Sequence, residues 1–351
     1  MQVVYSEKEL LHNPTMEMTR GELKPYVESP QRLVNIKQCI DKNPRFNVIE
    51  ARDYSLEPIL KVHEKDYLEF LKSIHHDWVT QGFPPDACIG DTFSSMAQHL
   101  PREIVKKTAN RTVSGKLGFY TADASSTFMK DTWIAAYASA QVVLTAAHQL
   151  LEGSKSIYAL CRPPGHHASH SFAAGYCYIN NAAVAARCLQ AKWKNILIVD
   201  IDYHHGNGSQ EIFYKDPSVF YTSLHAEDYP YFTGSVEEEG EGAGLGFNLN
   251  VPLPKDTTGD QYLEALNSLL HHPRVVQFKA EAVIISMGLD TWHQDPIAGF
   301  NGIENTETYK KMGALFKTST TGLPVLFIQE GGYTIERLGE LAVNVLEGYL
   351  D

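Results

Sequence analysis

The sequence predicts an α/β fold built on an open, mostly parallel β-sheet with helices on both faces. Two observations lead to this prediction. Short apolar runs of strand type alternate with segments of helical periodicity over the last two thirds of the 351 residues. Polar, glycine-flanked residues follow each of these runs, as expected where parallel strands end at one edge of a sheet and form a site there.

The first third of the chain is less regular than the rest. Met1–Tyr5 is typical of a short strand, and Arg32–Asp41 and Lys65–Ile74 show helical patterns. The segment 84–120 is rich in Gly, Pro, Ser and Thr, which predicts a long loop. A loop of this length in a compact domain is usually functional or lies at an interface.

The last two thirds of the chain supply the predicted sheet and its helical layers. The clearest helix is the alanine-rich segment Thr132–Leu151. The predicted strands are Ser156–Leu160, Asn195–Asp200, Ser218–Ser223, Glu281–Met287 and Leu323–Gln329. The predicted helices beside them are Asn180–Ala191, Gly208–Tyr214, Asp260–Leu270, Glu307–Thr318 and Ile335–Leu350. We expect a single domain, 1–351, with a long loop insertion around 84–130.

Composition and charge are those of an ordinary globular protein, with 43% hydrophobic and 21% charged residues. A formal charge of −12 disfavours nucleic-acid binding, which needs a basic surface, and is compatible with a cationic substrate. Five scattered cysteines without a CxxC motif argue against a disulfide framework and against a thiolate metal site. We find neither a signal peptide nor a run of roughly 18–20 apolar residues that would span a membrane. A cytoplasmic location is therefore the default expectation.

The most informative stretch is 198–208, where an apolar run ends in two carboxylates and two imidazoles. Asp200, Asp202 and His204 alternate along an extended segment and so share one side of it. Bare carboxylates placed together in a buried position need a cation to offset them. Asp290, after another predicted strand, completes with Asp202 and His204 a ligand set for a divalent metal: zinc most simply, with iron(II) or cobalt(II) as alternatives. Three protein ligands leave one position for water, the arrangement of a catalytic site.

Other polar residues at the predicted strand ends meet the further needs of a hydrolase. His166 and His167 can move protons, and Tyr333, on a Gly-Gly turn, can donate a hydrogen bond to a carbonyl oxygen. Two more histidine pairs, His75-His76 and His271-His272, lie at apparent helix ends. For these two pairs we expect solvated or capping roles.

These motifs resemble, in order and spacing, the motif series of the histone deacetylase family. The matching segments are Arg162-Pro163-Pro164-Gly165-His166-His167-Ala168, the run 200–208, Ser223-Leu224-His225, Gly288-x-Asp290-Thr291 and Glu330-Gly331-Gly332-Tyr333. The segments 21–32 and 290–297 resemble its bacterial acetylpolyamine amidohydrolase branch in particular. The resemblance covers nearly the whole chain and implies an arginase–deacetylase fold, with the active site at the C-terminal ends of the strands.

The resemblance also implies roles for the site residues. It assigns zinc to Asp202, His204 and Asp290. His167 would be the principal general base and acid, oriented by Asn207, where class I deacetylases have an aspartate. His166, held by Asp200, would act mainly through its charge, and Tyr333 would polarise the amide carbonyl. An amide partner stabilises an imidazolium less than a carboxylate does, so we expect His167 to be the more easily neutralised histidine.

Several further residues match binding positions of the family. Tyr176 and Tyr229 match the aromatic walls of the substrate tunnel, with Gly175 beside them, and Arg32 matches an arginine near the acetate exit. The family also binds potassium. One potassium site would use Asp200, Asp202, His204, Ser223 and Leu224, and a second would use Phe213, Asp216, Val219 and Phe247.

One departure from the polyamine branch concerns its substrate. A glutamate of that branch faces the distal ammonium of the polyamine, and the matching position here is Ser125. Asp123 is the nearest replacement.

The expected function is that of a zinc-dependent amidohydrolase that deacetylates acetylated polyamines or related primary-amine amides, and the alternative is an acetyl-lysine protein or peptide deacylase. The expected partner is a small cationic acylated amine, with no nucleic acid or membrane. A homodimer formed through 84–130 would narrow the tunnel mouth and exclude bulky proteins. A silent acyl-binding module would be expected to lose part of the catalytic set, and a two-manganese ureohydrolase would need more ligands.

Overall fold

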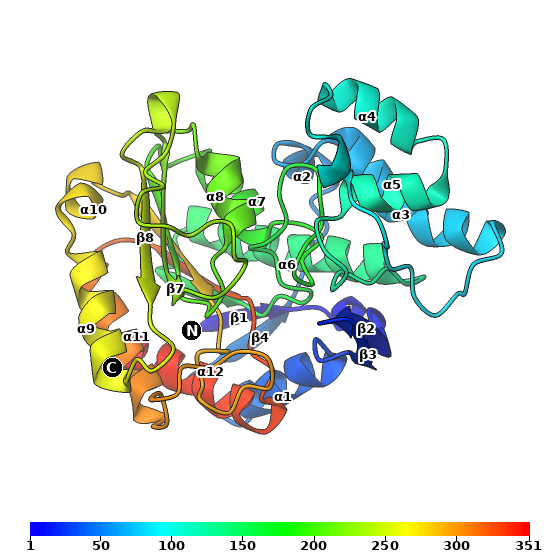
Figure 1. Ribbon diagram of the computed structural model, residues 1–351. Helices are drawn as coiled ribbons and strands as arrows, with labels where there is room; N and C mark the ends of the chain where they lie inside the picture. The colour runs from blue at the N-terminus through cyan, green and yellow to red at the C-terminus, as the bar shows by residue number, and fades with distance from the viewer.

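The computed structural model describes all 351 residues and confirms the predicted sheet. Eight strands form it, and every neighbouring pair is parallel. Their order across the sheet is β4 (Asn47–Glu50), β1 (Gln2–Tyr5), β5 (Ser156–Ala159), β10 (Val325–Gln329), β9 (Ala282–Met287), β6 (Ile196–Asp200), β7 (Val219–Ala226) and β8 (Asn248–Leu253). All eight carboxyl ends therefore lie along one edge of the sheet (Figure 1).

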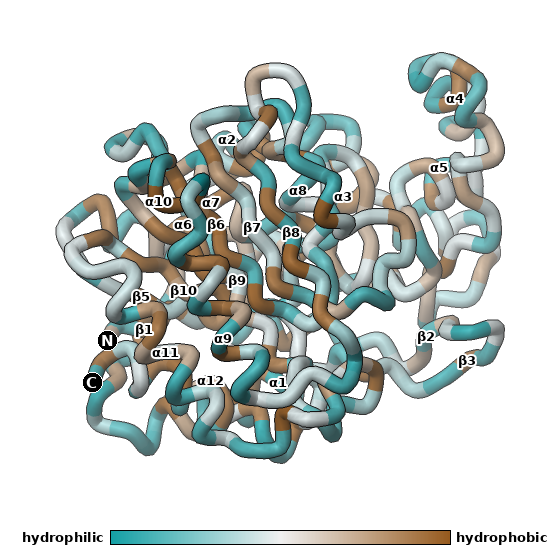
Figure 2. Tube along the Cα trace, turned by 60° about the vertical axis from the view of Figure 1, so that its left-hand side comes forward, coloured by the Kyte–Doolittle hydropathy of each residue, from teal (hydrophilic) through white to brown (hydrophobic).

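Side chains along each strand alternate between two hydrophobic cores, because successive residues of a strand point to opposite faces. Ile196 and Ile198 of β6 lie in one core, and Leu197 and Val199 lie in the other. Strands buried on both faces read as continuous apolar runs, which is why the sequence reveals them. Figure 2 shows these apolar strands in the interior, with more polar segments around them.

Helices cover both faces of the sheet (Figure 1). The helices that build the first core are α3 (Lys65–Thr80), α6 (Thr132–Leu151) and α7 (Asn181–Leu189). Those that build the second are α1 (Pro30–Asp41), α9 (Gly259–Leu270), α11 (Glu307–Ser319) and α12 (Ile335–Leu350). Three shorter helices connect these elements: α2 (Glu57–Leu60), α8 (Asn207–Phe213) and α10 (Pro273–Phe278).

Helix α6 is the one helix of the chain that could be mistaken for a membrane span. By length and composition alone it is long and apolar enough to cross a membrane, but 72% of its most apolar window is buried within the fold. Its alanines pack directly against the sheet. The apolar character of α6 is therefore that of a core helix.

The segment predicted as one long loop contains regular structure. It forms a 3₁₀ turn, η2 (Ser94–Ala97), and two helices, α4 (Arg102–Ala109) and α5 (Val113–Tyr120). Glycine was the misleading signal: a Cβ at Gly118 would lie 1.7 Å from the carbonyl oxygen of Thr92. Glycine at this position permits close packing of α5 and does not mark a loop.

Two histidine pairs and four short strands differ in how well the sequence predicts them. Helix α3 runs on to Thr80, so the pair His75-His76 lies inside it and not at its end. The pair His271-His272 has the predicted capping role, ending α9 and beginning α10. Strands β4 and β8 and the hairpin of β2 (Met16–Thr19) and β3 (Glu22–Pro25) were not predicted, because short strands with exposed or polar residues lack a clear period.

Candidate active site

Four strands deliver the candidate site residues to one edge of the sheet. The pair His166-His167 follows β5, and Asp202 and His204 follow β6. Asp290 follows β9, and the turn that carries Tyr333 follows β10. The order β5–β10–β9–β6 makes these strands neighbours, so residues far apart in the sequence meet at one place.

The structure brings the three predicted metal ligands together. Asp202, His204 and Asp290 offer one ligand atom each within 4.8 Å of one another. Nδ1 of His204 lies 2.9 Å from Oδ2 of Asp290 and 3.2 Å from Oδ1 of Asp202. Both carboxyl groups are fully buried. This is the one such group of histidine and carboxylate ligands in the chain.

The hydrogen bonding of the triad fits a divalent metal ion. Oδ1 of Asp290 accepts the backbone N–H of Tyr203 at 2.9 Å, whereas the buried Oδ2 accepts no hydrogen bond, although Nδ1 of His204 lies 2.9 Å from it. An unpaired buried carboxylate oxygen is costly unless a cation satisfies it. A Cβ at Gly288 or Gly331 would lie 2.1 or 2.6 Å from Oδ2 of Asp202, so only glycine leaves room there. The donors O, N and O suit a transition metal.

The two catalytic histidine candidates lie side by side with different partners. Their ring centroids are 4.0 Å apart. Nδ1 of His166 lies 3.1 Å from Oδ2 of Asp200, and Nδ1 of His167 lies 2.7 Å from Oδ1 of Asn207. Both expected contacts are thus present.

These partners give the two imidazoles opposite electrostatics. Burial lowers the pKa of His166, but the carboxylates of Asp202 and Asp200 outweigh it and raise this pKa to about 10. Burial, together with the charge of His166, holds the pKa of His167 well below its usual value. His167 is therefore the more easily neutralised ring, as expected, because burial and the neighbouring histidines outweigh the opposing effect of its hydrogen bond to Asn207, and His166 is the charged one.

Tyr333 is positioned by a contact of its ring with Arg32 and by a hydrogen bond of its backbone N–H. The guanidinium carbon of Arg32 lies 4.8 Å from the centroid of its ring. Its backbone N–H donates to Oδ2 of Asp295 at 2.7 Å, a contact that the sequence does not reveal. Gly332, with φ of +114°, shapes the turn just before it. Burial raises the pKa of the Tyr333 phenol, which therefore stays protonated and able to donate.

Arg32 has a structural role beyond its expected place near an acetate exit. Its guanidinium donates to the backbone carbonyls of Gly332 and Glu330 and to the carboxylate of Glu28. The carboxylate of Glu330 in turn accepts the backbone N–H groups of Gly165, at 2.7 Å, and His166. Arg32 thus clamps the turn that carries Tyr333 to the loop that carries the histidines.

The two predicted wall tyrosines flank this centre. The ring of Tyr229 stands edge-on to His167 and His204, with centroids 5.5 and 5.2 Å apart. The ring of Tyr176 stands edge-on to Tyr333, at 5.7 Å. Gly175 is required beside them, because a Cβ there would lie 2.3 Å from the ring of His167.

Carboxylates hold the outer parts of both walls. Asp123 accepts hydrogen bonds from the backbone N–H of Gly175, at 2.8 Å, and from the hydroxyl of Tyr229, at 3.2 Å. The hydroxyl of Ser125 donates to the other oxygen of Asp123 at 2.7 Å. Sequence reasoning missed a second carboxylate: Glu17 of strand β2, which is 2% exposed, lies near the phenol of Tyr176. Because the β2–β3 hairpin was not predicted, no signal pointed to Glu17.

Residues of the two expected potassium sites have different surroundings. Asp200 lies beside the metal triad, where it also accepts from the hydroxyl of Tyr221, and Ser223 hydrogen-bonds His225. At the second site Asp216 already pairs with the guanidinium of Arg187, at 2.6 Å. The other expected residues, Leu224, Phe213, Val219 and Phe247, lie on or next to β7, α8 and β8.

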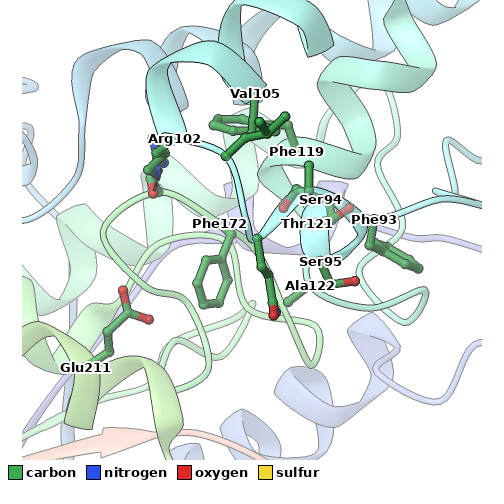
Figure 3. A pocket seen from close by; sticks show the side chains of 14 residues that line it. Phe93, Ser94, Ser95, Arg102, Val105, Phe119, Thr121, Ala122, Phe172 and Glu211 are labelled. Carbon is green, nitrogen blue, oxygen red and sulfur yellow. Dashed lines mark hydrogen bonds between the residues drawn. The ribbon is translucent and has the colours of Figure 1, made fainter.

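A separate cavity of about 450 Å³ lies under the α4–α5 arm (Figure 3). Arg102, Phe119, Phe172 and Glu211 are among its lining residues. None of the metal-ligand or histidine candidates lines it. The cavity is therefore distinct from the reaction centre.

Comparisons with known proteins agree with this geometry. A model of the histone deacetylase domain matches residues 26–349. Acetylpolyamine amidohydrolase 1 of Pseudomonas aeruginosa is 39% identical over 350 residues, which cover 99% of this chain and 98% of the relative. Acetylpolyamine amidohydrolase of Mycoplana ramosa is 38% identical over 355 residues, covering 99% of both chains. The crystal structure of acetylpolyamine aminohydrolase from Burkholderia pseudomallei superposes with a TM-score of 0.90 at 33% identity, covering 99% of this chain and 98% of that one.

Proposed function

The chain belongs to the histone deacetylase family, and we propose that it is a zinc-dependent amidohydrolase that deacetylates acetylated polyamines or related primary-amine amides. The observation that supports this most directly is the buried triad with its unpartnered Asp290 oxygen, next to two histidines of opposite electrostatics. A neutral base, a charged neighbour and a metal-ligand set are the parts that amide hydrolysis requires.

The metal ion would be held by Asp202, His204 and Asp290. When bound, such an ion acts as a Lewis acid, which polarises a carbonyl group and makes water a better nucleophile. Zinc is the simplest choice for two carboxylates and one imidazole, and iron(II) or cobalt(II) suit the same donors.

The side chains of the chain supply the proton transfers. The neutral imidazole of His167 takes the proton from the attacking water and then gives it to the leaving amine. Its Nδ1–H donates to Asn207, which leaves Nε2 free to accept. The imidazolium of His166 stabilises negative charge that develops on the carbonyl oxygen. The phenol of Tyr333 donates a hydrogen bond to that oxygen.

The walls select an extended acyl-amine. Tyr176 and Tyr229 present aromatic faces on which the methylene chain of such an amide would pack. A panel of acetylspermidine, acetylputrescine, acetylcadaverine and acetyl-lysine peptides, given to protein of measured metal content, tests the proposal. We expect the small acetylated amines to have the highest kcat/KM. A strong preference for the peptides would favour the protein deacylase instead.

A homodimer formed through 84–130 would account for this preference, because a second subunit would narrow the mouth. Three large apolar side chains of that segment support the proposal by their exposure: Met96 at 76%, Ile104 at 52% and Leu100 at 41%. Light scattering on purified protein should give twice the chain mass of 39.2 kDa. A monomer that prefers peptides would contradict both the dimer and the small substrate.

Potassium binding and a cytoplasmic location belong to the same proposal. The site at Asp200, Ser223 and Leu224 adjoins the metal triad, so a monovalent cation there would offset part of its negative charge. At the second site the cation of Arg187 is already paired with Asp216. Activity measured in potassium and in a large organic cation at equal ionic strength would reveal a dependence on potassium.

A further inference from the structure

Helix α8 contributes a buried polar side chain that the proton transfers do not use. Gln210 lies one turn after Asn207, the partner of His167, and residues three apart share one face of a helix. Its side chain is 6% exposed. Two amides of strand β8, Asn248 and Asn250, each donate to its Oε1 atom at 2.8 Å. The oxygen of Gln210 is therefore fixed from the side of the sheet.

The nitrogen of Gln210 binds the segment 229–238, the loop after β7 that begins with the wall residue Tyr229. Nε2 donates to the hydroxyl of Thr233, at 2.9 Å, and to the carboxylate of Glu238. That carboxylate also accepts two backbone N–H groups of the loop, so it folds the end of the loop around the amide. Both N–H groups and the oxygen of the Gln210 amide are thus used to join this loop and β8 to α8.

The tip of the same loop lies outside both hydrophobic cores. At the start of the loop, the backbone carbonyl of Tyr229 accepts the N–H of His205 at 3.3 Å. Beyond that point Tyr231 and Phe232 are 70% and 94% exposed, so packing does not hold the tip. The course of the loop that carries the Tyr229 ring therefore depends on its two ends, and Gln210 fixes the far one.

We propose that Gln210 is a positioning residue that holds the Tyr229 wall at a fixed distance from the base His167, and so determines how tightly the methylene chain of an acylated amine binds. The proposal rests on the deacetylase function proposed above and names what sets its affinity for the substrate chain. Because Gln210 and Asn207 lie on one helix, α8 positions both the wall and the partner of the base. A displaced loop would move the wall away from the chain while Asn207 keeps its hydrogen bond to His167.

The polarity of the contact between α8 and the loop makes the proposal specific. The amide nitrogen of Gln210 only donates, and the carboxylate of Glu238 only accepts. Gln210→Glu keeps the acceptor that faces β8 but places a second carboxylate against Glu238, and like charges in contact repel. The further substitution Glu238→Gln reverses the pair, so that an amide of the loop donates to a carboxylate of α8. The single variant should therefore release the loop, and the double variant should hold it again.

The test uses the zinc-loaded protein with acetylputrescine (N-acetyl-1,4-diaminobutane) as the substrate. N-butylacetamide and N-methylacetamide differ by three methylene groups, and their inhibition constants give their affinities whether or not they are hydrolysed. Each buried methylene group is worth about fourfold in affinity, so the wild type should bind the butyl amide at least about tenfold more tightly. Gln210→Ala and Gln210→Glu should each lower this preference by about fivefold, because one of the two walls is displaced. The kcat for acetylputrescine should change by less than about twofold.

The double variant Gln210→Glu/Glu238→Gln should recover most of the wild-type preference. A matched control lies near the C-terminal end of α6, which leads into the start of β5 and so lies at the opposite edge of the sheet from the site. Gln149 there donates to the carboxylate of Glu152 at 2.9 Å. Gln149→Glu places the same two groups together and should leave the preference and kcat unchanged. If the Gln210 variants do not fold, Glu238→Ala decides, because it removes the anchor from the loop side and must lower the same preference.

Three results would overturn the positioning role while leaving the deacetylase function intact. The first is an unchanged preference in the Gln210 variants, whether or not kcat falls. The second is a double variant that binds the two amides no differently from Gln210→Glu. The third is a wild type with equal affinity for both amides, because the wall would then not contact the chain. If the wild type does not hydrolyse acetylputrescine, the proposed function fails, and the positioning role fails with it.

Discussion

The floor of the candidate site, formed by the strand ends, and its mouth, the surface segments around Tyr176 and Tyr229, are built on different principles. The floor comes from the ends of four neighbouring strands, and the side chains of Asp202 and Asp290 there are fully buried. The mouth comes from a two-stranded hairpin, the segment after α5 and the loop after β7, where Phe232 is 94% exposed. A rigid sheet positions the reacting groups, whereas surface segments position the groups that distinguish substrates.

Substitutions should therefore act differently in the two regions. At the floor a lost group removes transition-state stabilisation, so kcat falls. At the mouth a lost group changes the affinity for one class of substrate, so ratios between substrates change while turnover persists.

The largest effect should come from the metal triad. In Asp290→Asn the oxygen that lacks a partner becomes part of an amide, a poor ligand for a transition metal. We expect the metal content to fall and kcat/KM to drop by more than about 100-fold. Loss of a residue that only hydrogen-bonds a metal ligand costs up to about 100-fold, and loss of the ligand itself should cost more. Elemental analysis and kinetics on the same sample check this. The exposed Asp260→Asn on α9 serves as the control, and full activity without bound metal would refute the assignment.

The next effect should come from the neutral histidine. His167→Ala removes the ring that moves the proton, so turnover should fall by about 10²–10⁴-fold for every substrate while the metal is retained. Metal content and kcat, measured for both a cationic and a neutral amide, separate this loss from a change at the mouth. The exposed His76→Ala provides a matched control. Selective loss with one of the two amides would show that His167 acts in recognition.

A smaller effect is expected from Tyr333, which lies where the floor meets a wall. Tyr333→Phe keeps the ring packed on Arg32 and Tyr176 and removes only the hydroxyl. We expect kcat to fall by about 10²–10³-fold with little change in substrate affinity, as for other lost donors to a developing oxyanion. Pre-steady-state binding and steady-state rates measure the two quantities. Tyr349→Phe on α12 is the control, and unchanged turnover would exclude the oxyanion role.

The same division explains what the sequence could reveal. Asp202 and His204 are spaced two residues apart after an apolar run, and Asp290 follows another such run, so local patterns and the rule of strand ends placed them correctly. The pairing of His167 with Asn207 was implied by the motif resemblance and is present. In these cases one short segment contains both the strand pattern and the reactive side chains, so both can be recognised from the sequence.

The mouth, and the turn after β10 that carries Tyr333, offer no such local signal. Glu17 meets Tyr176 across a hairpin whose strands are short and largely exposed, and Asp295 meets the backbone of Tyr333 across 38 residues. Arg32 reaches the carbonyl of Gly332 across 300 residues. Such contacts depend on how distant segments pack, and neither hydropathy nor turn chemistry encodes them. The glycine of α5 that was interpreted as a loop signal is a further example: its reason is a neighbour from another segment.

The smallest and most specific prediction concerns the pH dependence of selection at the mouth. Burial is the main reason that the pKa of Glu17 is raised to about 7; Glu28 and Asp123 also contribute to the rise, whereas Tyr176 and the Val27 backbone oppose it. Below this pH Glu17 is a neutral acid, and above it the carboxylate carries a negative charge near Tyr176. The substrate ammonium stays charged up to about pH 10. The ratio of kcat/KM for N-acetyl-1,4-diaminobutane to kcat/KM for N-butylacetamide should therefore rise by about threefold between pH 6 and 8. Titration of the catalytic groups affects both substrates equally and therefore cancels in this ratio. In Glu17→Gln the ratio should no longer change with pH. A wild-type ratio that stays constant between pH 6 and 8 would show that Glu17 has no part in substrate selection.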